Sequence, residues 1–302
     1  MSRAGRWAGI ALLATLAAGC VPPAIEAPPS APASAARPAP MPAPRPLPPA
    51  TFGVFSGTPQ QGNLMLGTAP PGTTTLTLDG MPVEVAGDGR FLIAFDRDAA
   101  PRATLLATLA DGRQAMKVFD VAPGDWRLER LDTVAKTPVP SAEFARRRPA
   151  ELEQIKAARD MRTDADGWRQ RFIWPAAGRI SGLFGAQRIY RGEPGAYHGG
   201  VDVAKPAGAP VIAPADGVVI LAASLPFTLE GNLLMLDHGM GLNSAFLHLS
   251  RIDVKVGDHV RQGQEIGRVG ATGRASGPHL HWAMMWRGKR IDPMRVAGDM
   301  GR

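Results

Sequence analysis

His198-Gly199-Gly200-Val201-Asp202 is the stretch of this sequence on which the assignment of its fold and chemistry depends. A histidine and an aspartate four residues apart offer an imidazole nitrogen and a carboxylate oxygen, two donor types that zinc prefers. The glycines between them let the backbone bend so that both side chains can reach one ion. Such a pair recurs by chance in many proteins, so a metal site is predicted only if further ligands accompany it.

His279-Leu280-His281 is the second pattern that can supply metal ligands. On a β-strand, side chains two residues apart point to the same face, so both histidines can address one site. Phe246-Leu247-His248-Leu249 adds a third candidate. The alternative is a pair of half-buried structural histidines. The last two-fifths of the chain, a glycine-dense region of β-prone runs, holds all six histidines: His198, His238, His248, His259, His279 and His281. This concentration predicts that the chemistry lies there.

Several short stretches between Trp174 and Pro293 together resemble the lysostaphin/LytM-type zinc metallopeptidases, which cleave peptide bonds within peptidoglycan. The stretches are Ser181-Gly182-Leu183-Phe184-Gly185, His198-Gly199-Gly200-Val201-Asp202, Pro210-Val211-Ile212-Ala213-Pro214-Ala215-Asp216-Gly217, Asp237-His238-Gly239, His248-Leu249-Ser250, Gly270-Ala271-Thr272-Gly273 and Gly277-Pro278-His279-Leu280-His281. The region of resemblance runs from about Trp174 to Pro293 and makes up about two-fifths of the chain. The resemblance implies a small, mostly antiparallel β-domain with a groove across it.

The resemblance also implies a role for each of five residues. His198, Asp202 and His281 match the three ligands of one zinc ion. His248 and His279 match two catalytic histidines beside it. Because neither metal pattern contains a glutamate, unlike the His-Glu-x-x-His metalloproteases, proton transfer is expected to fall to His248 or His279. One would act as general base and the other would stabilise the oxyanion, and the sequence does not apportion the two roles.

Three further positions complete the expectations for this region. His238 and His259 match no catalytic position; we expect a structural role for His238 and a surface turn for His259. Phe246 stands where many relatives have tyrosine, which is expected to remove a hydroxyl near the groove. The implied activity is hydrolysis of peptidoglycan peptide cross-links by a zinc-activated water. In a Gram-negative organism the expected bond joins D-Ala to diaminopimelate.

Two other classes of protein compete with the peptidase. The first is a zinc-free LytM-like lipoprotein that activates a separate cell-wall amidase. Such relatives have typically lost metal ligands, whereas this sequence retains all three. The second is a biotinyl or lipoyl carrier domain, which the stretch from Val256 to Gly267 resembles. The modifiable lysine of a Met-Lys-Met turn is missing there, which argues against a carrier.

Residues 1–20 resemble a bacterial lipoprotein signal. Arg3 and Arg6 precede an apolar run from Trp7 to Ala18, and small residues lead directly to Cys20, the only cysteine. The predicted outcome is a lipidated Cys20 that anchors the protein to the outer membrane, facing the periplasm. The alternative is a plain secretory signal, which would leave the protein soluble in the periplasm or secreted. A single cysteine excludes intramolecular disulfides.

Upstream of the peptidase region, composition divides the chain into three further parts. Residues 21–50 are almost entirely proline and alanine, and predict an extended tether. Residues 51–125 predict a small antiparallel, sandwich-like β-domain with an accessory role. Its expected strands are Thr74–Leu78, Pro82–Val85, Phe91–Phe95, Ala103–Leu109 and Ala115–Val121, separated by the hairpin signals Asp79-Gly80, Asp88-Gly89 and Asp111-Gly112.

The segment 126–171 is predicted to be a charged, partly helical connector. Pro149 is expected in the first turn of its helix, because Leu152, Ile155 and Ala158 follow at helical spacing. The peptidase domain then occupies 172–302, with representative strands at Pro210–Ala213, Gly217–Ala222, Leu233–Leu236 and His279–Met284. The fold class as a whole is therefore mainly β.

Composition and charge agree with this class and exclude one type of partner. Aromatic residues are sparse at 6%, while 35 glycines and 29 prolines favour β-structure with many turns. The net charge of +7 comes mostly from arginines spread along the chain, and the one short basic run is Arg146-Arg147-Arg148. A nucleic-acid binder would carry a basic stripe interleaved with aromatics. None is visible, so no nucleic-acid partner is expected.

Overall fold

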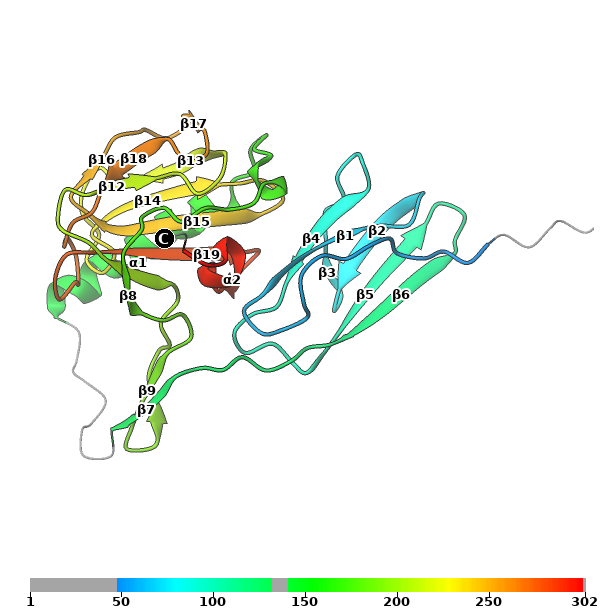
Figure 1. Ribbon diagram of the computed structural model, residues 1–302, viewed down its shortest axis with the longest axis horizontal. Helices are drawn as coiled ribbons and strands as arrows, with labels where there is room; N and C mark the ends of the chain where they lie inside the picture. Colours follow the sequence, from blue (N-terminus) through cyan, green and yellow to red (C-terminus); the bar gives the residue numbers. More distant parts are fainter. Residues whose placement is uncertain (1–47, 132–140, 301–302) are drawn as a thin grey trace, which may run out of the picture. The chain divides into compact units, whose positions relative to one another are not determined.

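The computed structural model describes residues 48–131 and 141–300 (Figure 1). The predicted signal segment, Cys20 and the tether up to residue 47 lie outside the described residues. Within the described ranges, no helix combines the length and the apolar character needed to cross a membrane.

The first described region is a small antiparallel β-structure, as predicted. Its strands are β1 (Leu64–Thr68), β2 (Thr73–Leu78), β3 (Met81–Pro82), β4 (Arg90–Ala94), β5 (Arg102–Leu109) and β6 (Gln114–Asp120). One sheet has the order β3-β2-β5-β6, and β1 pairs with β4 in a second. Alternate residues of β5 are buried, which is the pattern of a strand with one face on a core.

Two of the three predicted Asp-Gly hairpins are present. Asp79 and Gly80 both have positive φ, 51° and 79°, as a tight turn between β2 and β3 requires. Gly112, with φ 82°, lies in the turn that joins β5 to β6. The expectation for Asp88-Gly89 was wrong, because β4 pairs with β1 and not with β3. The predicted strand Pro82–Val85 is also shorter than expected and ends at Pro82, whereas β1 was not predicted.

The segment 126–171 contains a strand, a helix and a short 3-10 turn. These are β7 (Leu128–Leu131), α1 (Ala142–Asp160) and η1 (Gly167–Arg169). Pro149 lies in the interior of α1, so its predicted place in the first turn was wrong. The helix begins earlier because the Ser141 side chain caps it, accepting a hydrogen bond from the Phe144 N–H at 3.2 Å.

Side-chain contacts hold α1 in place despite its internal proline. Arg148 makes a bidentate pair with Glu230, at 2.6 and 2.8 Å. Glu151 accepts hydrogen bonds from the backbone N–H and the hydroxyl of Thr228, at 2.8 and 2.6 Å. Ile155 and Ala158 are buried against the following sheet. The helix is therefore fastened to the β-region that follows it, at the loop that contains Thr228 and Glu230.

That β-region is built on one large antiparallel sheet with the strand order β17-β13-β14-β15-β19-β11-β8. Strand β20 joins this sheet by pairing with β19. Its strands are β8 (Arg179–Gly182), β11 (Val201–Ala204), β13 (Gly217–Ala222), β14 (Asn232–Asp237), β15 (Leu242–Leu249), β17 (His259–Val260), β19 (His279–Trp286) and β20 (Lys289–Ile291). One smaller sheet contains β12 (Pro210–Ile212), β16 (Arg251–Ile252) and β18 (Glu265–Arg268). In another, β9 (Gln187–Tyr190) pairs with β10 (Glu193–Pro194) on one side and, in parallel, with β7 on the other. Helix α2 (Pro293–Ala297) follows β20.

The two faces of β19 have different surroundings, and this positions the site. Leu280, Trp282 and Trp286 are fully or almost fully buried in the main apolar core. The alternating residues His281 and Ala283 lie on the other face. Ala283 packs there in the smaller cluster that contains Ile155 and Ala158 of α1. Helix α1 thus packs on the sheet face that carries His279 and His281.

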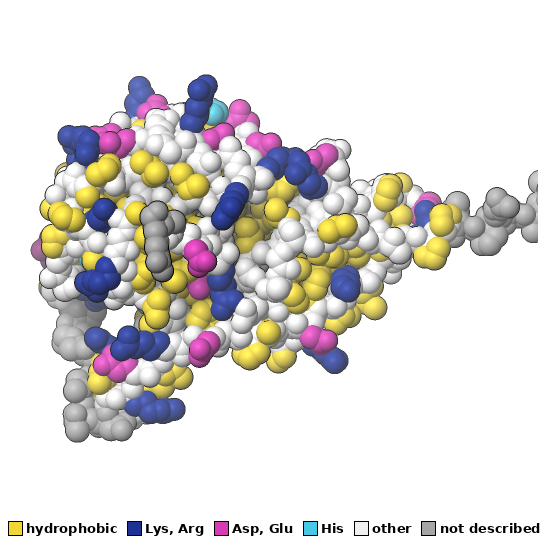
Figure 2. Space-filling view, viewed as in Figure 1, with side chains coloured by type: hydrophobic (Ala, Val, Ile, Leu, Met, Phe, Trp, Pro, Cys, Tyr) yellow, Lys and Arg dark blue, Asp and Glu magenta, His cyan; other side chains and the backbone are white. Residues whose placement is uncertain are grey.

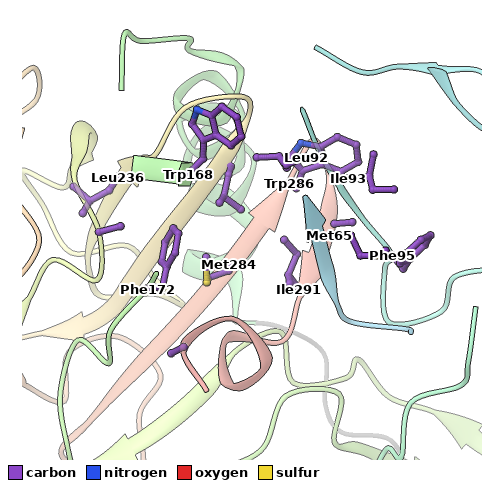
Figure 3. Packing of buried hydrophobic residues seen from close by; sticks show 14 of the residues in the cluster. Met65, Leu92, Ile93, Phe95, Trp168, Phe172, Leu236, Met284, Trp286 and Ile291 are labelled. Carbon is purple, nitrogen blue, oxygen red and sulfur yellow. The ribbon is translucent and has the colours of Figure 1, made fainter. Parts of the chain in front are cut away.

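The main core extends into the first β-region. Met65 and Leu92, from β1 and β4, belong to the same buried cluster as Trp286 and Ile291 (Figure 3). The backbone N–H of Asp292 donates to the Gly62 carbonyl at 2.8 Å. The 48–131 β-structure is therefore packed against the large antiparallel sheet through apolar contacts. On the surface seen in Figure 2, lysines and arginines are interspersed with acidic side chains.

His238 is fully buried beneath this sheet, with both ring nitrogens bonded. Its Nδ1–H donates to the Asp216 carbonyl at 2.8 Å, and its Nε2 accepts from the Ser244 hydroxyl at 2.8 Å. Burial lowers the pKa of His238 to about 4, although the Asp216 carbonyl and the Asp237 charge oppose the shift. The predicted structural role of His238 is therefore supported by its contacts.

The low pKa of His238 predicts a loss of stability in acid. His238 binds a proton near pH 6.5 in the unfolded chain and only near pH 4 in the folded chain. The contribution of neutral His238 to the free energy of unfolding is therefore fully present above pH 6.5, and it is lost as the pH falls from 6.5 to 4. The contribution of this group is about 3 kcal/mol at most. Urea unfolding at several pH values should show a shallower acid dependence for His238→Gln than for the unmodified protein. Equal slopes would contradict the prediction.

Candidate metal centre

Antiparallel pairing of β11 and β19 brings the three predicted ligands together. Asp202 is directly opposite His281 in the register, and His198 precedes β11 by a short glycine-containing turn. The Asp202 Oδ1 atom lies 3.1 Å from His198 Nε2 and 2.9 Å from His281 Nδ1, and the two nitrogens are 3.0 Å apart. Three donor atoms from distant parts of the sequence therefore converge on one point.

This donor set fits zinc. Two imidazole nitrogens and one carboxylate oxygen are the ligands of catalytic zinc sites, which leave a fourth position open. Ligand atoms about 2.0 Å from a tetrahedral zinc are separated by roughly 3.3 Å, close to the separations found here. Two lone pairs and a carboxylate held this closely repel one another unless protons or a cation lie between them.

Neighbouring backbone fixes the orientation of the ligands. His198 Nδ1 lies 2.9 Å from the Leu183 carbonyl, which can only accept, so Nδ1 carries the proton and Nε2 presents a lone pair. Gly182, on the adjacent β8, leaves space for Asp202, because a Cβ there would lie 2.2 Å from Asp202 Oδ2. A Cβ on Gly200 would lie 2.7 Å from His281 Nε2 and 2.4 Å from the Trp282 carbonyl.

The electrostatics of the three groups are coupled. Burial raises the pKa of the Asp202 carboxyl, but interactions with His198 and His281, whose rings donate to it when they are protonated, outweigh burial and hold that pKa well below its usual range. Burial lowers the pKa of His198, and Asp202 reverses this to a net increase. For His281, burial is the larger effect and its pKa falls. Asp202 is therefore ionised and available to a cation.

His248 and His279 lie beside the three-residue cluster. Their rings are 4.8 Å apart, and His279 Nε2 is 3.8 Å from Asp202 Oδ1. Each Nδ1 is held by a backbone carbonyl at 2.8 Å, from Thr272 and Gly277 respectively. Each Nε2 is therefore the nitrogen left to interact with a substrate. Burial lowers the pKa of His248 to about 4, and repulsion from His279 and His281 adds to the effect.

The backbone at His248 is strained. Its φ of 63° lies in the left-handed region, which is uncommon for residues other than glycine. Its N–H donates to the Glu230 carbonyl at 2.8 Å, and Glu230 is in turn held by Arg148 of α1. Strained residues of this kind persist where the surrounding structure fixes them, often at functional sites.

The remaining predicted positions lie outside the cluster. His259 has an exposed side chain on β17, so its surface location was predicted correctly although it lies in a short strand and not in a turn. Phe246 is fully buried in the main core with Trp282. The expectation that this position borders the groove was wrong, because Phe246 lies on the core face of β15.

Sequence reasoning missed the groups that orient the histidines. These are the carbonyls of Leu183, Thr272 and Gly277, together with the space provided by Gly182 and Gly200. Carbonyl oxygens belong to every residue type, so residue identity gives no signal for them. The glycines did occur in recognised motifs, but which atom each one accommodates is visible only in the structure.

Adjacent glycines provide a matched test of this geometry. Gly200→Ala should reduce bound zinc and lower stability by about 1–3 kcal/mol, because the added Cβ overlaps His281 and the Trp282 carbonyl. Gly199→Ala is the control, since the atoms nearest to its Cβ would belong to the Arg290 side chain, at the ordinary contact distance of 3.5 Å. Elemental analysis and thermal unfolding measure both effects. Equal zinc content and stability in the two variants would contradict the assignment.

Comparison with known proteins places this site in a family. The chain is 39% identical over 128 residues to the peptidoglycan DD-endopeptidase ShyA of Vibrio cholerae, covering 42% of this chain and 29% of that protein. It is 40% identical over 123 residues to the DD-carboxypeptidase/endopeptidase Mpg of Neisseria meningitidis, covering 39% and 27%. The chain thus spans less than a third of the length of these curated relatives.

A solved structure matches more of the chain. A Pseudomonas aeruginosa protein assigned to peptidase M23 superposes with a TM-score of 0.61 and 29% identity, covering 81% of this chain and 96% of that one. Residues 196–293, which include His198, Asp202, His248, His279 and His281, match the model of peptidase family M23. This chain therefore carries a domain of peptidase family M23.

Proposed function

We propose that this protein is a zinc-dependent endopeptidase that hydrolyses peptide cross-links of bacterial peptidoglycan, with the bond between D-Ala and diaminopimelate as its target. The observation that carries the proposal is the convergence of His198 Nε2, Asp202 Oδ1 and His281 Nδ1 beside two further histidines. The names of the relatives, DD-endopeptidases of peptidoglycan, support the substrate class.

In this proposal His198, Asp202 and His281 hold one zinc ion. Zinc bound there would supply a Lewis acid that polarises the scissile carbonyl and activates the attacking water. Asp202 contributes the one negative charge of the ligand set, so the site keeps a net positive charge toward the substrate. The Leu183 carbonyl keeps His198 in the tautomer that can bind the ion.

His248 and His279 handle protons in this proposal. Each has its Nδ1 occupied by a carbonyl and its Nε2 free, so each can accept a proton from the attacking water at Nε2. Once protonated, the same nitrogen can donate a hydrogen bond to the oxyanion or a proton to the leaving amine. The low pKa of His248 keeps its ring neutral at pH 7, which is the form required of a base. The division of the two roles is left open between these histidines.

The proposed location is the periplasmic side of the outer membrane, with Cys20 as the lipid anchor. The support is the sequence alone: Arg3 and Arg6, the apolar run that follows, and small residues before Cys20. A tether rich in proline and alanine between Cys20 and the first β-strand would let the peptidase reach peptidoglycan away from the membrane.

Single substitutions test the catalytic assignment. His248→Ala and His279→Ala should retain bound zinc and lose about 10²–10⁴-fold in turnover of cross-linked peptidoglycan, because each removes a proton-transfer group. His259→Ala is the matched control, since His259 is exposed and lies on β17. Muropeptide analysis of digested cell wall, with elemental analysis of zinc, measures both quantities.

Two outcomes of that experiment would contradict the proposal. Near-normal turnover in both histidine variants would remove the proton-transfer roles. A purified protein that contains no zinc, digests no wall and instead stimulates a separate cell-wall amidase would favour the non-enzymatic activator. Restoration of activity by zinc after chelation is expected only for the peptidase.

The anchor is tested separately by Cys20→Ala. The variant should lose incorporation of labelled palmitate and leave the membrane fraction, because the acylated side chain is gone. Ser34→Ala, a substitution within the predicted tether, is the control, and it should leave palmitate incorporation and membrane recovery unchanged. Unchanged palmitate incorporation and membrane recovery in Cys20→Ala would reject the lipoprotein assignment.

A further inference from the structure

A cavity of about 470 Å³ lies between α1 and the β19–β20 hairpin. Ile155 and Arg159 of α1 line one side, and Asn243 of β15 and Met285 of β19 line another. Arg287, at the turn into β20, closes the cavity on the hairpin side. Nothing in the proposed catalytic roles uses this space.

The charge that lines the cavity is strongly positive. Lys156, Arg159, Arg162 and Arg287 border it with a single carboxylate, Asp160. Asp160 is already paired with Lys156. Among the residues that the structure describes, none of the three arginines forms a close ion pair, and the charges of Glu230, Asp160 and Glu84 act on Arg159, Arg162 and Arg287 only from farther away. Arg162 donates to carbonyls at the end of α1, and Arg287 donates to the Pro82 carbonyl.

Arg159 is the most exceptional of these arginines. Its Nε is buried and has no hydrogen-bond partner within residues 48–131 and 141–300. Burial, together with repulsion from Arg290, lowers the pKa of its guanidinium. A buried guanidinium without a close carboxylate is costly, and an anion bound to Arg159 in the cavity that this residue lines would offset that cost.

The cavity lies on the same sheet face as the metal centre. His281, Ala283 and Met285 alternate along β19, so the ligand His281 and the cavity-lining Met285 lie on one face of the strand, with Ala283 packed against α1 between them. Four residues of extended chain span about 13 Å. Arg290 continues the positive charge between the two places, because its side chain lies over Gly199, next to His198.

We propose that this cavity is a subsite for a free carboxylate of the peptide substrate, with Arg159 and Arg162 as its recognising groups. The inference rests on the peptidase function proposed above and adds the chemical class of group that is recognised. A stem peptide held at the metal centre carries carboxylates on its side chains and at its end, within reach of an extended segment of about four residues. Guanidinium groups bind carboxylates with charge-assisted, often bidentate, hydrogen bonds. Arg159 and Arg162 are positioning residues and take no part in bond cleavage.

The test compares two cross-linked stem peptides that differ only in whether their free carboxylates are converted to amides. Calorimetric titration of the mature, zinc-depleted protein should show about ten-fold tighter binding of the carboxylate form, a difference typical of one charged contact. With zinc restored, KM for that form should be about ten-fold lower than for the amide, with kcat within two-fold. Arg159→Gln, and independently the exposed Arg162→Gln, should each reduce both preferences.

Arg102→Gln is the control with the same charge change, because Arg102 is exposed on β5, where it pairs with the exposed Asp120. It should keep the full preference. Equal binding of the two peptides by the unmodified protein, or an intact preference in both cavity variants, would overturn the subsite. Inorganic phosphate that displaces the carboxylate peptide at equal concentration would also overturn it, by showing a general anion site.

The two proposals fail in different ways. Hydrolysis of both peptides with equal KM would leave the peptidase standing and reject the subsite. Absence of hydrolysis, with a carboxylate preference in binding that Arg159→Gln removes, would reject the peptidase and retain the subsite.

Discussion

The placement of the Asp202 carboxylate is the constraint on which the rest of the site depends. Its Oδ1 lies within 3.1 Å of ring nitrogens from His198 and His281, and 3.8 Å from His279. A carboxylate removed from water must be compensated by hydrogen bonds or by a cation. Strand pairing places Asp202 opposite His281, and Gly182 on β8 leaves space for its side chain. Both features fix the position of this carboxylate.

Helix α1 extends this arrangement beyond the ligands. Its Arg148 holds Glu230, whose carbonyl accepts the N–H of the strained His248. Its Ile155 packs in the cluster that includes Ala283, two residues from His281 on β19. The helix therefore supports His248 through Glu230 and forms one wall of the cationic cavity. A segment predicted only as a connector contributes to the geometry of the candidate site.

Local sequence signals predicted the fold best where the turn itself requires a particular residue. Asp79-Gly80 needs two left-handed residues, and the hairpin formed as expected. Asp88-Gly89 also forms a turn, but the partner of β4 is β1, a choice made by packing of Phe91 and its neighbours in the core. The start of α1 was misplaced because Pro149 suggested a beginning, whereas the cap at Ser141 determines it.

For the site, the sequence predicted the functional side chains but not the backbone groups that orient them. The resemblance of its short histidine- and aspartate-containing motifs to LytM-type peptidases predicted the five residues that the structure brings together. Carbonyls such as those of Leu183 and Thr272 have no signature in residue type, although they decide which nitrogen of each histidine is free. The cavity beside α1 was equally hidden, because Arg159 and Arg287 meet only after the chain has folded.

Anomalous X-ray diffraction from crystals of the purified protein, collected on both sides of the zinc absorption edge, tests the central claim most directly. The account predicts one zinc peak bonded to His198 Nε2, Asp202 Oδ1 and His281 Nδ1 at about 2.0–2.2 Å, with its open side toward His248 and His279. A peak held by other ligands, or no peak between these three residues in protein supplied with zinc, would contradict it.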